Sequence, residues 1–517
     1  MIVDARRDWP TKLEADICII GGGAAGITLA RELAGSGCTV LLLESGSRRY
    51  DPATQALYRG TSGDLVYDNA AIQRRMFGGS TTTWAGRCRP LDPIDFEERP
   101  WIEASGWPFT RADLNPFYER ARELCGIDLS QQDVDEWEAS LAARLDFEEL
   151  AVAMLERPRP LDFAAAYESD LTSADNVSIY FNANVVGFEH AVGDLSSISV
   201  ATLDGHEFSI EAGLAVLAAG GVENARLLLA SGLNRSGLVG RYFMDHAYMN
   251  AGLLKPGSRR LPDELCPGAT GHHGLLTMPE RRLRAEGLGS AAVYFIPRAA
   301  YRLAPSYASA GFAAIAELRA AAGRGELGRE SWALVGKAAR DAHRILDSFA
   351  RRVRDQIKND GSLVARVVIE ATPNRASRIE LANERDRLGQ PTANVDWRPA
   401  DLDNRSLERF IQILRSDLAV HGFGDLDVRA DLWPDSISPG RHPSGATRMH
   451  IDSGLGVVNE NCRLHELSNL YVAGSSVFPT SGIANPTLTI LALAVRLADH
   501  LKVVMPTQTR RDTEPDG

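Results

Sequence analysis

One stretch near the start of the chain constrains the fold most strongly. An apolar run, Ile17–Ile20, leads into the glycine-rich segment Gly21–Gly26, and apolar residues at helical spacing follow up to Leu33. A second apolar run, Thr39–Leu43, ends at Glu44. This order of strand, glycine turn, helix, strand and acid is typical of a dinucleotide-binding unit. The stretch therefore predicts a doubly wound, Rossmann-like α/β domain.

Each glycine of this turn has a distinct physical role in such a unit. Gly21 permits the tight turn, Gly23 lets the backbone approach a pyrophosphate, and Gly26 lets helix and strand pack closely. The N–H groups at the start of the helix favour the phosphates, and Glu44 is placed to accept hydrogen bonds from ribose hydroxyls. We therefore predict six cofactor-binding residues here: Gly21, Gly23, Ala24, Ala25, Gly26 and Glu44. The motif leaves NAD and FAD open, although its place at the start of a long chain favours a flavoprotein.

Composition limits the remaining possibilities. A chain of 517 residues with 44% apolar residues is expected to form two domains with a substantial core. The formal net charge of −12 is spread along the chain, which argues against a nucleic-acid surface. The six cysteines are scattered and have no metal-binding spacing, so we expect a reducing compartment and no metal. With neither a signal peptide nor an 18-residue apolar run visible, the expected location is the cytoplasm, without a membrane segment.

Three later segments resemble parts of a flavin site. The segment 74–86 contains Gly78 and Gly79 followed by hydroxyl residues, and it predicts either a phosphate- or flavin-binding loop or a plain surface loop. A strand that ends near Gly220 runs into a second helix, and Val185 lies in a preceding strand, where it is a candidate for contact with adenine. These segments predict a cofactor site assembled from distant parts of the chain.

The C-terminal region predicts another junction of strand, glycine and helix. A short strand, Leu470–Ala473, ends at Gly474 and Ser475. Asn485 and Pro486 then open a long helix, with Asn485 as the expected cap and Pro486 as the first helical residue. The positive end of that helix would stabilise negative charge on a reduced flavin.

Together these motifs resemble the glucose–methanol–choline (GMC) oxidoreductase family. The resemblance rests on the opening unit and on five further segments in the same order: GGSTTTW, LAAGGVENARLLLAS, GRYFMDH, HPSGATRM and LYVAGSSVFPTSGIANPTLT. The pair His442 and Asn485, in place of two histidines, is closer to the branch that resembles pyranose oxidases and sugar dehydrogenases. The matches span nearly the whole chain apart from about 256–358.

The resemblance implies a Rossmann-like FAD-binding domain interleaved with an α+β substrate domain built on an antiparallel sheet. The expected bounds of the FAD-binding domain are 1–95, 165–250 and 445–503. The expected bounds of the substrate domain are 96–164 and 251–444, and residues 504–517 are expected to form a disordered tail.

The family resemblance also implies a reaction. An alcohol, most simply a sugar or glycoside hydroxyl, would lose its proton to His442, while Asn485 holds the same oxygen and the hydride passes to N5 of FAD. Oxygen or another electron acceptor would then reoxidise the flavin. Some relatives attach FAD through a histidine directly before the tryptophan of the glycine loop, but Thr83 stands there, so FAD should be bound non-covalently. The further implied cofactor residues are Gly78, Gly79, Ser80, Thr83, Trp84, Val185, Gly220, Gly474, Ser475, Asn485, Pro486 and Thr487.

Several alternatives remain open at this level. The substrate could be a non-sugar natural-product alcohol, and the chain could be a lyase of the same family without net redox chemistry. It could also be a dehydrogenase subunit that docks on an electron-transfer protein, or a non-catalytic flavin-binding protein. Among the other histidines, His246 is interpreted as structural or at the pocket edge, and His450 and His465 as structural. The adjacent His272 and His273 make a poor metal pair.

Overall fold

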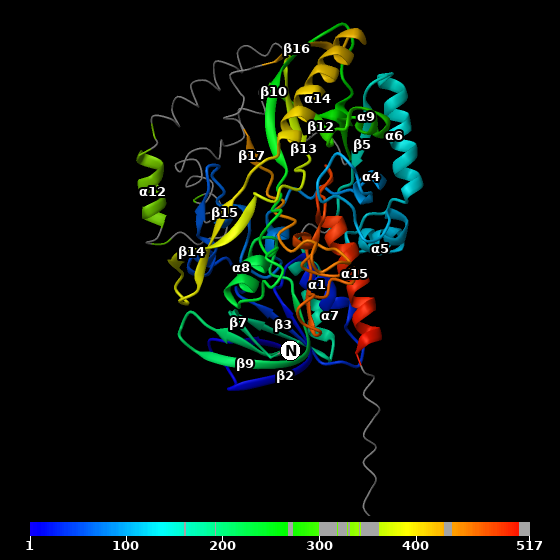
Figure 1. Cartoon of the computed structure of the whole chain (residues 1–517). Coiled ribbons are helices and arrows are strands. Elements are labelled where there is room, and N and C mark those ends of the chain that lie inside the picture. Colours follow the sequence, from blue (N-terminus) through cyan, green and yellow to red (C-terminus); the bar gives the residue numbers. More distant parts are fainter. Residues whose placement is uncertain are drawn as a thin grey trace, which may run out of the picture.

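The computed structural model describes residues 1–159, 162–191, 193–266, 272–298, 331–340, 361–428 and 437–505, together with positions 318, 328 and 342. Two large sheets divide this part of the molecule (Figure 1). The labelled strands β2, β3, β7 and β9 lie in its lower part, and β10, β12 and β13 lie in its upper part with helix α14 beside them.

The lower sheet confirms the Rossmann-like prediction. Its strand order is β1-β6-β3-β2-β9-β8-β7, and β18 pairs with β9. All pairs are parallel except β9-β8 and β8-β7, which form a hairpin extension. The strands are β1 (Ile2–Asp4), β2 (Lys12–Ile20), β3 (Val40–Glu44), β6 (Val177–Phe181), β7 (Asn184–Ala191), β8 (Asp194–Ala201), β9 (Glu207–Leu217) and β18 (Leu470–Val472).

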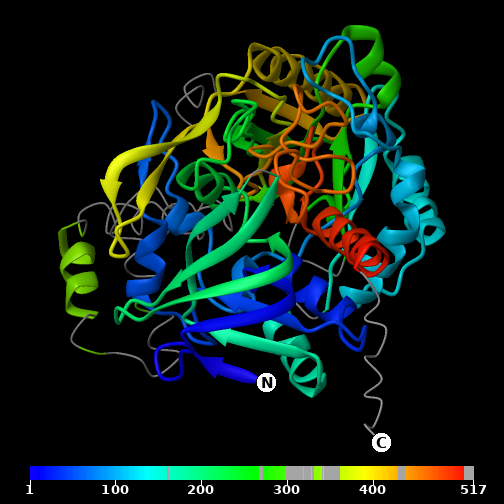
Figure 2. The same cartoon turned by 60° about the horizontal axis from the view of Figure 1, so that its bottom comes forward.

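Helices cover this sheet because its central strands carry buried, mainly apolar runs. All five residues of β3 are buried, as are the last four of β2. Such runs need cover on both faces. Helix α1 (Ala24–Glu32) packs against α15 (Thr487–Val504) and α7 (Phe163–Ser173), and α15 also packs against α5 (Arg111–Leu124). Figure 2 shows α15 in red beside the sheet and labels the N-terminus of the chain, next to β1.

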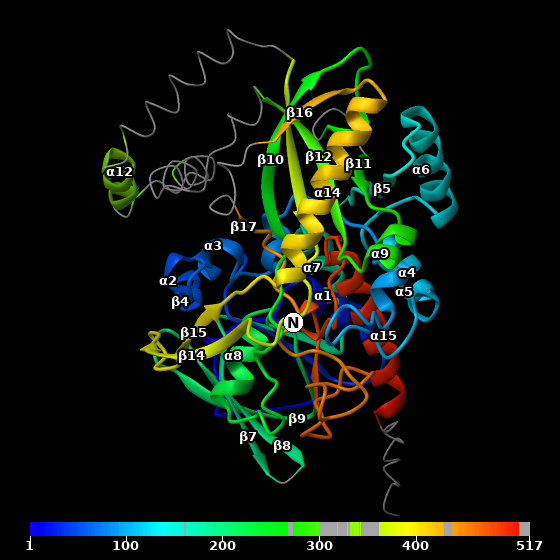
Figure 3. The same cartoon turned by 45° about the horizontal axis from the view of Figure 1, so that its top comes forward.

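The upper sheet is antiparallel, as expected for the substrate domain. Its order is β16-β10-β13-β12-β11-β5, and the short β17 pairs with β10. Helix α14 (Asp401–Val420) packs on β12 and β16, and Figure 3 shows it crossing the sheet. The strands are β5 (Ala151–Leu155), β10 (Ala247–Pro256), β11 (His273–Thr277), β12 (Ala291–Pro297), β13 (Leu363–Ile369), β16 (Gly424–Val428) and β17 (Ser438–Pro439).

A small third sheet lies beside the other two. It consists of the hairpin β14 (Arg378–Arg385) and β15 (Pro391–Asp396), together with β4 (Thr61–Ser62). Figure 3 shows it on the same side of the molecule as α2 and α3. The remaining elements are α2 (Pro52–Gln55), η1 (Ala56–Tyr58), α3 (Asn69–Ile72), η2 (Gly79–Thr82), α4 (Pro93–Phe96), α6 (Gln131–Leu145), α8 (Glu223–Ala230), η3 (Asp263–Leu265), α9 (Glu280–Glu286), α12 (Ser331–Arg340) and η5 (Ser475–Val477).

The interleaving of the two large sheets agrees with the predicted architecture. Strands of the lower sheet come from both ends and the middle of the chain, and strands of the upper sheet come from the segments between them. The exact domain bounds, 1–95, 165–250 and 445–503 against 96–164 and 251–444, stay a prediction. Residues 506–517 of the expected tail, and most of the segment 299–360, lie outside the described residues.

One local prediction is wrong. Asn485 does not cap α15: the helix begins at Thr487, Pro486 occupies the N-cap position, and no side chain caps it. The amide of Asn485 instead donates to the carbonyl oxygen of Arg87, 3.0 Å away. A contact between segments nearly 400 positions apart therefore replaces the local cap.

Candidate active site

A cavity of about 1500 Å³ lies between the two large sheets. At the lower sheet it reaches the carboxyl ends of β2, β3, β9 and β18, which is where open α/β sheets bind their ligands. Pockets for one small ligand usually measure roughly 300–1,000 Å³. The cavity therefore has room for a dinucleotide together with a substrate.

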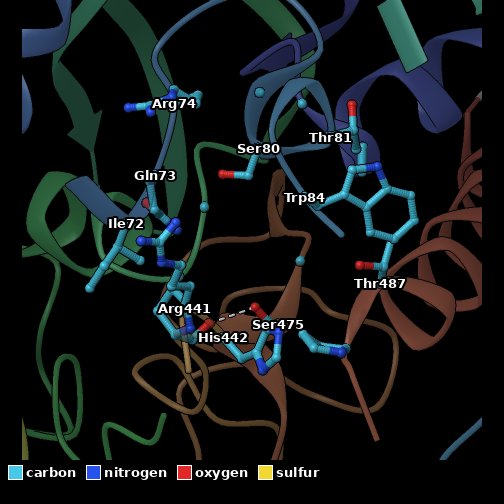
Figure 4. A pocket seen from close by; sticks show the side chains of 18 of the residues that line it. Ile72, Gln73, Arg74, Ser80, Thr81, Trp84, Arg441, His442, Ser475 and Thr487 are labelled. Carbon is cyan, nitrogen blue, oxygen red and sulfur yellow. Dashed lines mark hydrogen bonds between the residues drawn. The ribbon is translucent and has the colours of Figure 1, made fainter. Parts of the chain in front are cut away.

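Nearly all residues predicted for the site line this cavity. The residues that do so are Gly21, Gly23, Ala24, Ala25, Glu44, Gly79, Ser80, Thr83, Trp84, Val185, Gly220, His442, Gly474, Ser475, Asn485, Pro486 and Thr487. Figure 4 shows Trp84 and Thr487 on one side and His442 beside Ser475 on another. Gly26 and Gly78 do not line it.

The glycine turn presents backbone to the cavity. A Cβ added to Gly23 would meet no atom within 4 Å, and Gly23 caps α1 without a side-chain hydrogen bond. The N–H groups of the first turn of α1 are thus open to an anion. Gly26 lies behind the turn, where a Cβ would stand only 1.9 Å from the carbonyl oxygen of Gly21. Gly26 thus permits close packing of helix on strand, the role expected of it.

Glu44 is buried at the end of β3. One carboxylate oxygen accepts from the backbone N–H of Gly22 at 2.9 Å and the other from that of Gly46 at 2.7 Å. Burial raises the pKa of Glu44, although these two donors oppose the rise. The carboxyl group is therefore held rigidly at the edge of the cavity, in the place where ribose hydroxyls are bound in the dinucleotide fold.

The second glycine junction carries a buried ion-pair cluster. Glu223, the first residue of α8, lines the cavity and pairs with Arg75 and Arg226 at 2.8 and 2.7 Å. Burial opposes the charge on Glu223, but the two arginines together lower its pKa to about 2. This cluster fixes the segment 73–75 against α8 at the cavity wall.

His442 makes a contact that the sequence did not indicate. Its Nδ1 lies 2.9 Å from Nδ1 of His246, and Nε2 of His246 lies 2.9 Å from the carbonyl oxygen of Gly482. His246 is fully buried, and the interpretation of this residue as structural or at the pocket edge is now refined: it is the direct partner of His442.

These distances determine where the ring protons are. A carbonyl oxygen only accepts, so Nε2 of His246 carries a proton and donates it to Gly482. Burial lowers the pKa of His246 to about 4, so this ring is neutral and its Nδ1 accepts. His442 must then donate from its own Nδ1, which leaves its Nε2 with a lone pair. Among the described residues that nitrogen has no hydrogen-bond partner, and His442 lines the cavity, so we infer that Nε2 opens on it.

Electrostatics keep His442 neutral. Burial, the neighbouring His246 and the charge of Arg441 all hold the pKa of His442 well below its usual value. Its backbone N–H donates to Asp245 at 2.8 Å, and the hydroxyl of Tyr67 donates to the other carboxylate oxygen at 2.8 Å. Burial raises the pKa of Asp245 to about 7. The His442 backbone is thus tied to the segment that also carries His246.

Other cavity residues were missed by the sequence analysis, because they lie on strands whose register the sequence does not reveal. Tyr248, Asn250, Tyr294 and Arg366 line the cavity from β10, β12 and β13, and Arg87 does so from the segment after the glycine loop. The only available signal was the alternation along these strands, which places Arg366 on the opposite face from the buried Ala365 and Val367.

The residues present fit FAD. Backbone-exposing glycines stand at both Gly23 and Gly474, where an added Cβ would meet nothing within 4 Å, and the uncapped first turns of α1 and α15 reach the same cavity. Among the described residues, no three His, Cys, Asp or Glu side chains gather in a way that could hold a metal ion.

Comparison with known proteins gives a consistent result. Residues 16–244 match the family described as FAD dependent oxidoreductase, and residues 373–494 match the family described as GMC oxidoreductase. The chain is 26% identical to paromamine 6'-oxidase of Streptomyces fradiae over 96% of its own length and 93% of that protein. It is 24% identical to the fructose dehydrogenase large subunit of Gluconobacter japonicus, over 95% of this chain and 98% of that one.

The fold is also similar to that of solved structures. The crystal structure of pyridoxine 4-oxidase from Mesorbium loti superposes with a TM-score of 0.60 at 20% identity, covering 94% of this chain and 98% of the other. Both sheets therefore belong to a known fold. No helix in the described part of the chain is both long and apolar enough to cross a membrane.

Proposed function

We propose that this chain, an FAD-dependent alcohol oxidoreductase that matches the GMC oxidoreductase model over residues 373–494, uses His442 as its base and a sugar or glycoside hydroxyl as its substrate. The observation that carries the assignment of the base is the chain of hydrogen bonds from Gly482 through His246 to His442. It leaves a lone pair on Nε2 of His442 at the cavity. An unprotonated imidazole is the group that an alcohol proton requires near neutral pH.

In this proposal the side chains of the protein carry out the transfer of the substrate's hydroxyl proton. In the proposed mechanism, Nε2 of His442 accepts the hydroxyl proton. Nδ1 of His442 keeps its own proton and continues to donate it to Nδ1 of His246. The ring would then become an imidazolium that still donates to His246. Because burial and Arg441 disfavour that cation, it would give up its proton readily once the product has left.

Asn485 would orient the substrate. Its amide nitrogen already donates one hydrogen to the carbonyl oxygen of Arg87, which fixes the side-chain torsion. Because Asn485 lines the cavity, the second hydrogen of that nitrogen and the amide oxygen would be available to a bound hydroxyl. A hydroxyl held by this amide and by His442 has a restricted direction for its carbon–hydrogen bond.

FAD, when bound, supplies the acceptor for the hydride that leaves the carbinol carbon. We propose that the first turn of α1 and Gly23 bind its diphosphate, Glu44 its ribose, and the segments around Trp84 and Thr487 its ring system. Val185 and Gly220 would line the adenine end. Because Thr83 precedes Trp84 where a covalent link would need histidine, the cofactor would be held non-covalently and be released on denaturation with acid.

The substrate class is supported by the relatives, whose names refer to paromamine, fructose and C-glycosides. We propose oxygen or a second electron acceptor as the co-substrate. The six cysteines are all free thiols, which supports a reducing compartment such as the cytoplasm.

Anaerobic mixing with a panel of sugars, glycosides and simple alcohols tests the proposal. We expect the absorbance of oxidised flavin to bleach with one or more sugar-type alcohols. Bleaching only by non-sugar alcohols would contradict the substrate class. A yellow protein that turns over a substrate without any bleaching would instead be a lyase. Admission of air after bleaching separates an oxidase, which recolours quickly, from a dehydrogenase.

A further inference from the structure

Two arginine side chains stand on the substrate side of the cavity, and neither has a carboxylate partner in the described part of the chain. Arg366 projects from β13 and Arg87 from the segment after the glycine loop, and both line the cavity. The guanidinium of Arg366 donates to the amide oxygen of Asn250 at 3.2 Å and lies over the ring of Tyr248 at 5.3 Å. That of Arg87 lies over the ring of Tyr294 at 5.8 Å. Neither forms an ion pair with any described residue.

The two arginines meet at one patch of the sheet. Arg366 is the direct cross-strand partner of Tyr294 in the β12-β13 pair, and cross-strand partners have Cβ atoms about 4.5–5.5 Å apart. Arg87, in the segment after the glycine loop, lies over the ring of the same tyrosine. We call these residues the arginine patch: Arg87, Arg366, Tyr248, Asn250 and Tyr294.

The charges of the two arginines influence the pKa values of neighbouring side chains. His273 packs edge-on against Tyr294 at 5.3 Å, and burial together with the charge of Arg87 lowers the pKa of His273 to about 3. Arg366 and Arg87 also oppose the rise that burial causes in the pKa of Tyr248. His273 is therefore neutral, and its buried Nε2 has no hydrogen-bond partner.

Among the residues that the structure describes, no acidic side chain balances this charge on the sheet wall. The described cavity residues of the upper sheet are Leu155, Tyr248, Asn250, Leu275, Tyr294, Ile296, Arg366, Val368, Ser438 and Pro439. The carboxylates that do line the cavity, Glu44, Asp68 and Glu223, come from the segments of the cofactor side. Unpaired guanidinium groups in a concave, partly desolvated wall favour an anionic ligand.

The patch is also close to the proposed base. The ring of Tyr248 lies 6.4 Å from that of His442 and carries Arg366 over its own face. Asn485 holds the backbone of Arg87. An alcohol whose hydroxyl is held by His442 and Asn485 can therefore place its remaining atoms near the two arginines.

We propose that Arg87 and Arg366 bind an oxyanion on the substrate, so that the alcohol oxidised here carries a carboxylate or phosphate group a few atoms from the reacting hydroxyl. This inference rests on the proposed function, since it takes His442 as the point where the hydroxyl sits. Neutral sugars would bind weakly, and amino sugars, which are cationic, would bind most weakly.

The test is equilibrium binding by calorimetry to the FAD-loaded protein under anaerobic conditions. The probes form a matched series: methyl α-glucopyranoside, its C6 carboxylate analogue methyl α-glucopyranosiduronate, glucose 6-phosphate and glucosamine. A charge-assisted contact to arginine predicts that at least one of the two anions binds about 10-fold or more tightly than the neutral glycoside. The carboxylate and phosphate probes show which oxyanion fits. Higher salt should weaken the binding of whichever anion shows this preference.

Variants assign the effect to the patch. Arg366→Gln and Arg87→Gln should each remove most of the preference for the anion, whereas Arg366→Lys should keep part of it because the charge remains. Arg387→Gln is the matched control, because Arg387 is exposed in the β14-β15 turn and does not line the cavity. Unfolding midpoints of all variants check that they fold.

The outcomes separate this inference from the proposed function. If the neutral glycoside binds as tightly as both anions, or if Arg366→Gln and Arg87→Gln leave the preference unchanged, the inference is wrong, whatever the flavin does. If an anion binds through the arginines and no alcohol of the series or panel bleaches the flavin, the oxyanion site at Arg87 and Arg366 stands, whereas the oxidation of an anionic alcohol is contradicted together with the proposed function.

Discussion

Nδ1 of His246 lies 2.9 Å from Nδ1 of His442, and the first of these rings is itself anchored on the carbonyl oxygen of Gly482. Two like nitrogens at this distance require one donor and one acceptor, and the carbonyl decides which is which. His246 is thus a positioning residue, since it sets the tautomer of the ring that faces the cavity. It acts on the substrate only through His442.

The first prediction concerns this positioning. His246→Ala removes the acceptor for Nδ1–H of His442, so we expect kcat to fall by about 10-fold or more, since one lost hydrogen bond of this kind is worth about 0.5–1.5 kcal/mol and the tautomer is no longer held. His246→Asn places an amide oxygen near the original Nδ1 and should recover part of the loss. The measurement is the rate of flavin reduction with saturating substrate.

A purely structural role of His246 makes a different prediction. In that case the Ala and Asn variants would lose activity in proportion to their loss of stability, and the pH dependence would stay unchanged. Comparison of unfolding midpoints and pH profiles for both variants distinguishes the two roles.

The second prediction concerns pH. The pKa of His442 is held well below 6.5 by burial, by His246 and by Arg441, so the ring stays unprotonated as the pH falls below that value. We expect kcat/KM to remain level from about pH 8 through pH 6.5 and to decline only in more acidic solution, where an ordinary histidine, with a pKa of about 6.5, would already have lost half its basic form. A half-maximal point at or above pH 6.5 would contradict the environment described for His442.

The third prediction separates two glycines of the same turn. Gly23→Ala should fold normally, because its Cβ meets nothing, but should lose FAD because the methyl group occupies the cavity beside the first turn of α1. Gly26→Ala should destabilise the fold by about 1–3 kcal/mol, because its Cβ overlaps the carbonyl oxygen of Gly21. Flavin content and urea denaturation measure the two effects. An unstable Gly23→Ala with full flavin content would refute the assignment.

The fourth prediction concerns the buried cluster of Glu223, Arg75 and Arg226. Because breaking a buried ion pair from one side leaves uncompensated charge, Glu223→Gln should lower the free energy of unfolding at pH 7 by about 3 kcal/mol. The folded-state pKa of Glu223 is lowered to about 2 from 4.5, so this stabilisation is complete above pH 4.5 and disappears as the pH falls toward 2.

Denaturant titrations of wild type and Glu223→Gln across that range provide the check. The difference between the two proteins should shrink with acid. A difference that is already absent at pH 7, or that grows below pH 4.5, would contradict the role of the cluster.

The sequence predicted the cofactor side well because its signals are local. The glycine turn, α1 and Glu44 follow one another within thirty residues, and their roles depend on spacing along one strand–helix–strand unit. The N-cap of α5 is a local feature of the same kind, because the side chain of Thr110 accepts from the N–H of Asp113 three residues later. Such features need no knowledge of the remaining chain.

The substrate side could not be predicted because it depends on long-range register. Arg366 faces the cavity only because β13 pairs with β10 and β12 in one register, and a shift by one residue would bury it. Asn485 was assigned as a cap from its neighbours, but its amide is bonded to Arg87 instead. The partnership of His246 with His442 joins segments 196 positions apart, for which the sequence holds no local signal.

The measurement that tests the central claim most directly is anaerobic flavin reduction in wild type and His442→Gln, with His190→Gln as the matched control on an exposed strand position. If Nε2 of His442 takes the hydroxyl proton, the variant should retain FAD and fold normally while its reduction rate falls by about 10²–10⁴-fold. The control should reduce at the wild-type rate. A His442→Gln protein that reduces its flavin as fast as wild type would contradict the assignment of the base.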